Sequence, residues 1–301
     1  MSANERRIAE ANECFQRAQK HLKTSIWQLK TKPDYDSAAV EYERAAVCFR
    51  NAERLDLCKD AYLKASECHG SNGNRFHEAK AKESAAMVAK DAKDFASAVK
   101  LFEECSEGYL HSGHMDTAAM TIDKGAKMME LSEPKEAIKL YEKGLELVQQ
   151  ADRSRMAMDF SHRLIRLHLG IKDYPAAIRT TLDLIEKYKE VQELPKIGQL
   201  VVGLVLIELV KGDSISALKM LNYLPNADDF REEISVTKAL LDSFDEGDDK
   251  AFQEVLKRGY LRSMDNEYLR LMKLLHAPSG GGGSKLGATD SNLENEEEDL
   301  R

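Results

Sequence analysis

Small residues recur about every twenty positions along this chain, and that spacing limits the fold more than any other feature. The series is Ala38, Cys58, Ala79, Ala98, Ala118, Ala137, Ala157, Ala177 and, after a skipped position at Ile197, Ala217. Several members follow a bulky apolar residue by three positions, as Ala98 follows Phe95. Residues three apart share a helix face, so each pair sets a large side chain beside a small one that lets a neighbouring helix approach closely. The pattern predicts one helix for about every twenty residues.

Residues that favour helix starts occur at the same spacing. Aspartates stand just before the pairs, where an N-cap is expected, at Asp34, Asp94, Asp173 and Asp213. Four of the six prolines fall within two residues of a predicted start: Pro33, Pro134, Pro175 and Pro195. The first helical turn tolerates proline because a backbone amide at that point would have no partner within the helix. Both residue types support the helix boundaries that the repeat predicts.

Two such helices form a hairpin of about forty residues, compared with 34 in a tetratricopeptide repeat and about 40–47 in HEAT-type repeats. We therefore expect an all-α protein, a right-handed α-solenoid similar to the tetratricopeptide class, with about 13–14 helices and a helical cap at its C-terminal end. Such repeats bury their apolar faces only against their neighbours, so the product is an elongated, curved stack with a long surface. Function is expected on that surface and at the two ends of the stack.

Composition and cysteine content agree with this fold. The chain has 301 residues, of which 43% are hydrophobic and 32% are charged. These values are typical of a helical protein with one continuous core. The cysteines are odd in number and form no C-x-x-C pair: Cys14, Cys48, Cys58, Cys68 and Cys105. Their positions within helical patterns predict reduced, partly buried thiols of a cytosolic protein.

The sequence predicts no membrane-spanning segment. The first residues, MSANERRIAEANECF, are rich in charge and lack the apolar stretch of a secretory signal. The longest apolar run, Ile197–Val210, has 14 residues and is interrupted by Gln199 and Glu208. It is too short to span a bilayer. We expect it to form the most buried helix of the stack.

Changes in composition divide the chain into three parts. Residues 1–224 hold a first helix, expected over residues 4–23, and the helical repeats. Residues 225–277 form the cap, with shorter helices expected over 230–244, 250–258 and 266–276. Residues 278–301 begin with a proline and a run of four glycines, which predicts a flexible linker that is either a native hinge or an engineered spacer. The acidic tail after it is expected to be disordered.

None of the common catalytic or cofactor-binding motifs occurs in the sequence. There is no G-x-x-x-x-G-K-[ST], no G-x-G-x-x-G after a strand and no H-E-x-x-H. His111 and His114 flank Gly113 in an expected turn, but no carboxylate or thiol completes a metal site at ligand spacing. We therefore expect no cofactor, no bound metal and no enzyme activity. The alternative is a metal-dependent enzyme that uses the His111/His114 turn.

The segment between the first helix and the first repeat has apolar residues outside the repeat pattern. Ile26, Trp27 and Leu29 lie there, with Lys23 and Lys30 beside them. These side chains either pack back onto the first hairpin or touch a membrane. Tryptophan favours the bilayer interface, and each lysine near an anionic surface adds roughly 1 kcal/mol. We expect the second arrangement, a weak and reversible membrane contact.

The end of the chain concentrates negative charge. From Lys285 to Arg301 there are six acidic and two basic residues, which gives −4 of the net charge of −8. Leu300 directly follows the run EEED. Such a tail is either solvated without a partner, or it docks in a groove on a basic partner while the acidic residues steer the approach.

Three longer strings resemble the soluble NSF attachment proteins (SNAPs), and in particular the gamma members of that family. They are KPDYDSAAVEYERAAVCFRNA at 32–52, HMDTAAM at 114–120 and YLRSMDNEY at 260–268. The resemblance covers essentially the whole chain. It implies an adaptor that binds SNARE complexes, which are four-helix coiled coils. It also implies that the adaptor recruits and stimulates the AAA+ ATPase NSF for SNARE disassembly in membrane fusion and vesicle transport.

The resemblance also implies roles for particular residues. The membrane-contact loop would consist of Ile26, Trp27 and Leu29 with Lys23 and Lys30. The NSF-binding residues would be Asp242, Asp245, Glu246, Glu297, Glu298, Asp299 and Leu300. The SNARE contacts of the family are basic residues of the concave face. The aligned positions of this chain include Met120 and Met158, and the nearby bases are Lys124, Lys127, Arg163 and Arg166.

Partners and location follow from the same resemblance. It implies binding to the NSF hexamer, to SNARE four-helix bundles and to a membrane surface, but not to nucleic acid. The protein would be a monomer in solution, with several copies on each SNARE complex. It would lie in the cytoplasm, peripherally associated with intracellular membranes such as those of ER–Golgi transport. The alternative is a tetratricopeptide-type co-chaperone or scaffold that binds peptide C-termini.

Overall fold

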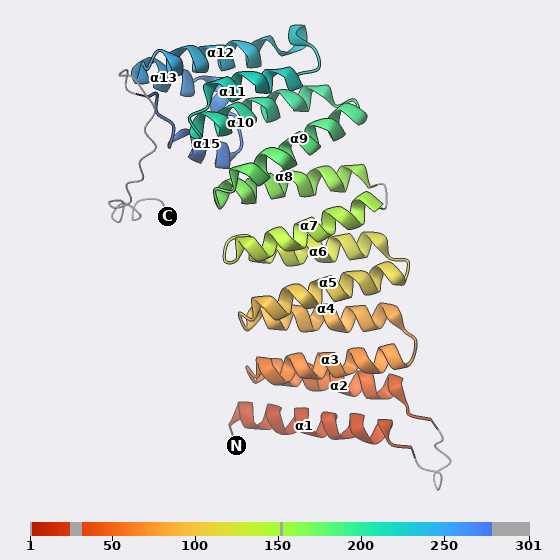
Figure 1. Ribbon diagram of the computed structural model, residues 1–301. Coiled ribbons are helices and arrows are strands. Elements are labelled where there is room, and N and C mark those ends of the chain that lie inside the picture. Colours follow the sequence, from red (N-terminus) through yellow and green to blue (C-terminus); the bar gives the residue numbers. More distant parts are fainter. Residues whose placement is uncertain (1, 25–31, 151–152, 279–301) are drawn as a thin grey trace.

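The computed structural model describes residues 2–24, 32–150 and 153–278 (Figure 1). These residues form fifteen α-helices and no β-strand. The helices are α1 (Ala3–Leu22), α2 (Tyr35–Asn51), α3 (Leu55–Ser71), α4 (Arg75–Asp91), α5 (Phe95–His111), α6 (Met115–Met129), α7 (Pro134–Gln150), α8 (Ser154–Gly170), α9 (Tyr174–Glu190), α10 (Ile197–Val210), α11 (Ser214–Met220), α12 (Arg231–Asp245), α13 (Asp249–Leu256), α14 (Gly259–Arg262) and α15 (Asn266–Met272).

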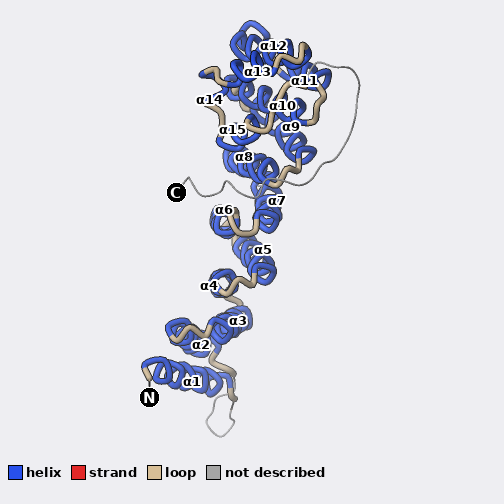
Figure 2. Tube along the Cα trace, turned by 90° about the vertical axis from the view of Figure 1, so that its left-hand side faces the viewer, coloured by secondary structure: helices blue, strands red, loops and turns tan. Residues whose placement is uncertain are grey.

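Consecutive helices pack against one another and form a stack that rises from α1 to α12 (Figure 1). Viewed from the side, α4 and α6 lie in one layer, and α3, α5 and α7 lie in the other (Figure 2). This arrangement confirms the predicted α-solenoid. The described residues contain one helix more than the upper expected number, because α13 ends at Leu256 and Gly259 then begins the four-residue helix α14.

The twenty-residue repeat consists of a 17-residue helix and a three-residue turn. For example, α3, α4 and α5 have 17 residues each and start twenty residues apart. The small residues of the predicted series are at most 1% exposed: Ala38, Cys58, Ala79, Ala98, Ala118, Ala137, Ala157, Ala177 and Ala217. Gly108 of α5 lies so close to Ala79 of α4 that a Cβ added to Gly108 would be 2.9 Å from the Cβ of Ala79. The predicted close approach of neighbouring helices at these positions is therefore confirmed.

Each turn ends one helix and begins the next with very few residues. In the turn between α4 and α5, Lys93 has a left-handed φ of 60° and its amide donates to the carbonyl of Lys90 at 2.9 Å. The amide of Asp94 donates to the carbonyl of Ala89, also at 2.9 Å, which completes a Schellman ending. The carboxylate of Asp94 accepts the amide of Ser97 at 3.3 Å and so caps α5.

The same turn recurs along most of the stack, although the four residues between α6 and α7 include no left-handed one. Left-handed residues at the other turns between α2 and α11 are Glu53, Gly73, Gly113, Lys172, Gln192 and Gly212. The predicted N-cap aspartates all accept a backbone amide of the helix that follows: Asp34, Asp94, Asp173 and Asp213. The N-cap prediction is confirmed, and the left-handed residue explains why three residues are enough to reverse the chain.

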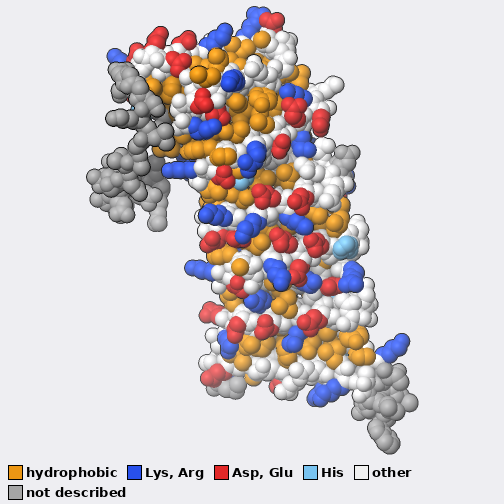
Figure 3. All heavy atoms as spheres, in the orientation of Figure 1, with side chains coloured by type: hydrophobic (Ala, Val, Ile, Leu, Met, Phe, Trp, Pro, Cys, Tyr) orange, Lys and Arg blue, Asp and Glu red, His pale blue; other side chains and the backbone are white. Residues whose placement is uncertain are grey.

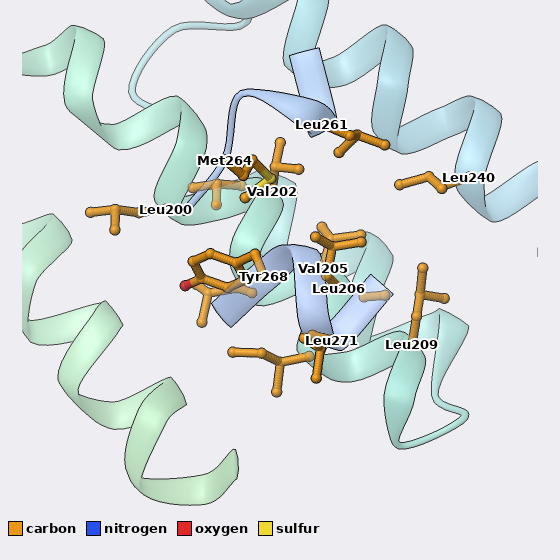
Figure 4. Close-up of a cluster of buried hydrophobic side chains, with 14 of the residues drawn as sticks. Leu200, Val202, Val205, Leu206, Leu209, Leu240, Leu261, Met264, Tyr268 and Leu271 are labelled. Atoms are coloured by element: carbon orange, nitrogen blue, oxygen red, sulfur yellow. The ribbon is translucent and has the colours of Figure 1, made fainter. Parts of the chain in front are cut away.

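Helix α10 is enclosed by the C-terminal part of the stack (Figure 4). Twelve of its 14 residues are buried, as predicted for the most buried helix. Ile197, at the skipped position of the repeat, is fully buried at the start of this helix, so the position is occupied by a larger side chain. Among the residues that the structure describes, no helix is long and apolar enough to cross a membrane.

Helix α15 turns back from the end of the stack and packs on α8 and α10. Tyr268 of α15 lies against Gly203 of α10, where an added Cβ would be 2.6 Å from the tyrosine ring (Figure 4). One hydrophobic cluster extends from Met158 to Ala277 and includes α10 and α15. After α15, Asp249 of α13 accepts the amide of Ala277 at 2.9 Å. The chain therefore leaves the last helix at a fixed place beside α13.

A buried acid joins α1 to α2 at the other end of the stack. Glu41 is 8% exposed and accepts hydrogen bonds from Arg17 of α1 and from Arg44, both at 2.8 Å. Burial alone would raise the pKa of Glu41. The hydrogen bond from Arg17 and the charges of the two arginines outweigh burial and hold this pKa below its usual value. Ionised Glu41 therefore stabilises the contact between the two helices.

We expect Gly113→Ala and Lys93→Gly to change stability in opposite directions, by about 0.5–1 kcal/mol each. A Cβ at Gly113 would meet nothing within 4 Å, so only its left-handed φ of 83° opposes alanine. Lys93 already bears that strain, and glycine would relieve it. Urea unfolding measures both variants, with Lys90→Gly as a helical control that should destabilise. A change of the same sign for Gly113→Ala and Lys93→Gly would contradict this account of the turns.

We expect Glu41→Gln to destabilise the protein by about 1 kcal/mol at pH 7. The pKa of Glu41 is lower in the folded protein than the value near 4.3 expected when unfolded, so its stabilisation is fully present above that value. It is lost as the pH falls through the folded pKa. Denaturant unfolding at several pH values should therefore show the difference between parent and variant shrinking below about pH 4. A difference that stays constant down to acid pH would argue against an ionised Glu41.

Candidate interaction surfaces

The outward side chains of α2, α4, α6 and α8 form one surface, which we call the even-helix face. The first three of these helices begin forty residues apart, so residues forty apart occupy equivalent places. Val40 of α2 and Met120 of α6 are equivalent, and they are 45% and 65% exposed. Val47 is also exposed, and its equivalent in α6 is Lys127. The face thus carries exposed apolar side chains on both α2 and α6.

Ion pairs link successive helices across the even-helix face. Lys124 of α6 lies 2.8 Å from Glu83 of α4. Arg163 of α8 lies 3.5 Å from Asp123 of α6 and 3.3 Å from Glu130, directly after α6. We call these five residues the ion-pair ladder. It connects α4, α6 and α8, which are not neighbours in sequence.

Buried tyrosines of the other layer hold two acids of the ladder. Tyr109 of α5 donates to Glu83 at 2.9 Å, and Tyr141 of α7 donates to Glu130 at 2.6 Å. Burial raises the pKa of both hydroxyls, and the nearby carboxylates raise it further, so both remain donors. The acids are therefore held from inside the stack, while their basic partners approach from the solvent side.

All four bases predicted for SNARE contact lie on this face, and each has an acidic neighbour. Two of them belong to the ladder. Lys127 lies 2.5 Å from Asp123 within α6, and Arg166 of α8 lies 3.9 Å from Asp265, just before α15. The exposed fraction of the four side chains ranges from 24% for Arg163 to 47% for Lys127. An acidic partner that binds these bases would replace their present acidic neighbours with its own acids.

Of the two methionines aligned with family contacts, only one reaches the surface. Met120 is 65% exposed on the even-helix face, whereas Met158 is 8% exposed and belongs to the hydrophobic cluster around α10. Met158 therefore contributes to packing. The tilt of a helix toward its neighbours decides which of its faces is buried.

The sequence analysis does not identify the acids of the ladder, although a signal for them exists. Glu43, Glu83 and Asp123 are spaced by forty residues and occupy equivalent places on α2, α4 and α6, and Arg163 of α8 follows Asp123 by forty residues. A search for charges repeated every forty residues finds this row. A search every twenty residues does not, because consecutive helices alternate between the two layers. The pairing itself needs the structure, since Lys124 and Glu83 are 41 residues apart.

A groove of about 300 Å³ adjoins the ladder between α8, α15 and the turn after α6. Arg163 and Arg166 of α8 line it, together with Arg270 of α15, which lies 2.7 Å from Glu267. Leu131 stands fully exposed beside it. The groove offers a partner both charged groups and an apolar contact at the C-terminal end of the even-helix face.

The face drawn in Figure 3 also has charges of both signs interspersed over the middle of the stack, with more hydrophobic side chains toward its ends. Ion pairs also cross between helices of the other layer: Lys143 of α7 lies 3.1 Å from Glu107 of α5, and Lys59 of α3 lies 3.0 Å from Asp94. With mixed charges over both layers, attraction to a partner would come from particular pairs rather than from one broad field.

The acids predicted for NSF contact lie at the C-terminal end of α12. Asp242, Asp245 and Glu246 are exposed, and none has an ion-pair partner in the described ranges. Asp248 follows them and caps α13. Acidic side chains are unfavourable at a helix C-terminus because the helix dipole is negative there. The cluster thus works against the stability of α12.

The remaining predicted site residues lie outside the described part of the chain. These are Ile26, Trp27, Leu29 and Lys30 of the membrane-contact loop and Glu297, Glu298, Asp299 and Leu300 of the tail. Lys23 is described and is exposed at the C-terminal end of α1. On the far side of the loop, the amide of Asp34 donates to the carbonyl of His21 at 3.0 Å. The two ends of the loop are therefore joined at its base.

The alternative metal site has no support in the described residues, which contain no group of three or more side chains able to hold a metal ion. His114 lies 3.1 Å from Ser112 and packs on Phe76, with ring centroids 4.7 Å apart. The five cysteines are free, and all except Cys48 are buried. Burial raises the pKa of Cys68 to about 11, so this thiol is protonated at neutral pH.

Most of the chain matches one protein family. Residues 9–260 match the family described as "Soluble NSF attachment protein, SNAP". The gamma-soluble NSF attachment protein of Dictyostelium discoideum is 26% identical over 255 residues, which cover 84% of this chain and 78% of its own. The Arabidopsis thaliana protein of the same name is 24% identical over 259 residues, covering 85% and 88%. The alpha-soluble NSF attachment protein of Vitis vinifera is 25% identical over 153 residues, covering 50% and 52%.

A long helical stack with exposed, charge-paired surfaces is the architecture of an adaptor that binds other proteins along its length. The chain belongs to the soluble NSF attachment protein family, because the family match spans far more than half of it. Its similarity to gamma members extends over most of both chains, which confirms the predicted resemblance. The family consists of adaptors rather than enzymes, so the prediction that this chain is not an enzyme is also confirmed.

We expect Lys124→Ala and Lys127→Ala to change the free energy of unfolding by no more than about 0.5 kcal/mol, because half-exposed ion pairs contribute little. Arg163→Ala should cost about 1–2 kcal/mol. Its side chain is less exposed, lies near two acids and packs over the ring of Tyr141 at 5.8 Å. Urea unfolding measures all three variants. Equal effects of the three substitutions on the free energy of unfolding would contradict this difference between Arg163 and the two lysines.

Proposed function

We propose that this protein binds SNARE four-helix bundles along its even-helix face and presents them to NSF at its C-terminal end. The observation that carries the proposal is the family match over residues 9–260, together with relatives named for NSF attachment that align over most of their length. The protein would act in membrane trafficking and would hydrolyse nothing itself.

The even-helix face has the features that such a bundle requires. A coiled coil is long and exposes acids and bases beside short apolar stretches. The stack offers a similarly long surface with the exposed Val40, Val47 and Met120 and the half-exposed bases of α6 and α8. Acids of the bundle would replace Glu83, Asp123 or Asp265 beside those bases. Because both the old and the new pairs are near solvent, this exchange costs little free energy.

The two ends of the stack would supply the other contacts. Asp242, Asp245 and Glu246 form an acidic surface on α12 that has no ion-pair partner among the described residues, and it would suit a basic domain of NSF. Leu300, behind the acidic run of the tail, would provide an apolar anchor for the same partner. At the opposite end, Ile26, Trp27 and Leu29 would touch the membrane and raise the local concentration of the protein there.

Disassembly of a purified SNARE complex by NSF tests these assignments separately. Leu300→Ala should slow disassembly both in detergent and on liposomes, whereas Trp27→Ser should slow it only on liposomes. Lys124→Glu with Lys127→Glu should weaken binding to the SNARE bundle at least about tenfold, since the reversal places like charges against its acids. Lys100→Glu, on the exposed side of α5, is the matched control and should behave as the parent.

Two results would count against the proposal. If the parent bound NSF but supported no disassembly, the bound partner would be something other than the SNARE complex tested. If the Lys124/Lys127 double variant bound the bundle as tightly as Lys100→Glu, the even-helix face would not be the SNARE-binding surface.

A further inference from the structure

A second groove lies at the C-terminal end of the stack, between α13, α14 and α15. Its volume is about 360 Å³. We call it the cap groove. Its apolar floor consists of Leu256, Leu269 and Met272, and its rim of Gln253, Lys257, Arg262 and Lys273. The site proposed for SNARE binding does not include any of these residues.

The rim of the cap groove carries positive charge that is largely uncompensated. Lys257 lies 2.8 Å from Glu254, but Arg262 and Lys273 are exposed and have no ion-pair partner among the described residues. An apolar floor with a basic rim is complementary to an acidic segment that also carries a large apolar side chain. The groove is therefore suited to an acidic peptide rather than to a basic one.

We propose that the cap groove binds the acidic end of its own chain, residues 290–300, in an intramolecular contact. That segment, DSNLENEEEDL, contains six acids and two leucines. Its acids would pair with Arg262 and Lys273 while a leucine packs on the apolar floor. Resting on the function proposed above, the inference adds regulation: a docked tail hides Leu300 from NSF until NSF displaces it.

The chain leaves the last helix beside this groove. Gln253 of the rim donates to the carbonyl of Leu275 at 2.8 Å, and Asp249 of α13 holds the amide of Ala277. From Ser279 to Leu300 there are 22 residues. A flexible chain of that length spans about 25 Å on average, so the tail would reach the groove at an effective concentration of about 1 mM. Even a contact with an intrinsic Kd of about 1 mM would then form in about half of the molecules.

Zero-length carbodiimide coupling tests this contact, because the reagent joins a lysine amine to a carboxylate only where the two touch. In the full-length monomer, Lys257 and Lys273 should couple to the carboxylates of residues 296–299 at least roughly tenfold more than Lys219 and Lys238 do. Those two control lysines are exposed on α11 and α12 and lie outside the groove. Coupling should fall in 1 M salt, where charges are screened within about 3 Å.

Charge exchange provides the matched variants. Arg262→Glu with Lys273→Glu should remove the preferential coupling, and adding Glu297→Lys with Glu298→Lys should restore it between positions 273 and 297–298. All four side chains lie on the surface or in the tail, and circular dichroism should confirm unchanged helix content. Coupling that is spread evenly over the control lysines, or that occurs only between molecules, would overturn the proposal.

The consequence for NSF is measured separately. Releasing a tail that is docked half of the time should make the groove variant bind NSF about twofold more tightly than the parent. The coupling experiment contains no NSF, so its failure would leave the adaptor function standing. Conversely, if the chain showed the expected coupling but did not bind NSF, the intramolecular contact would be supported and the proposed function would be wrong.

Discussion

The whole stack depends on a turn that reverses the chain within three residues. A left-handed residue lets two amides satisfy the carbonyls at the end of one helix, and the next residue caps the following helix, as Lys93 and Asp94 do. So short a turn keeps consecutive helices antiparallel and in contact. Bulky residues on both sides would then clash, which explains why a small residue recurs with the turn, as Ala98 does after Asp94. The period, the helix length and the small residues are thus consequences of one constraint.

This constraint leaves the outward faces free to carry charge, and the structure uses them to link helices that the turns do not join. The ion-pair ladder connects α4, α6 and α8, with Tyr109 and Tyr141 holding two of its acids from the other layer. The ladder stabilises the stack only modestly at Lys124, which is half exposed, and more at Arg163, which is less exposed. Its pairs can therefore be exchanged for those of a partner without unfolding the helices that carry them.

The C-terminal end gathers several features into a small region. The return of α15 onto α8 and α10 places the chain exit beside α13, next to both the acids of α12 and the cap groove. Hydrogen bonds from Gln253 to the carbonyl of Leu275 and from the amide of Ala277 to Asp249 fix the chain beside α13 where it leaves the last helix. If the tail docks as proposed, NSF and the cap groove would compete for one segment.

The sequence by itself determined the number and spacing of the repeat helices, their N-caps and the buried character of α10, because turns, caps and hydrophobic periodicity depend on residues close together in the chain. The family resemblance also rested on contiguous strings. Only the tertiary structure decided which charges meet, since Glu83 and Lys124 are 41 residues apart and their distance depends on how α4 and α6 tilt and stack. It alone also decided that Met120 is exposed and that α15 folds back against Gly203. Small helix rotations accumulate along a solenoid, and no local pattern in the sequence records them.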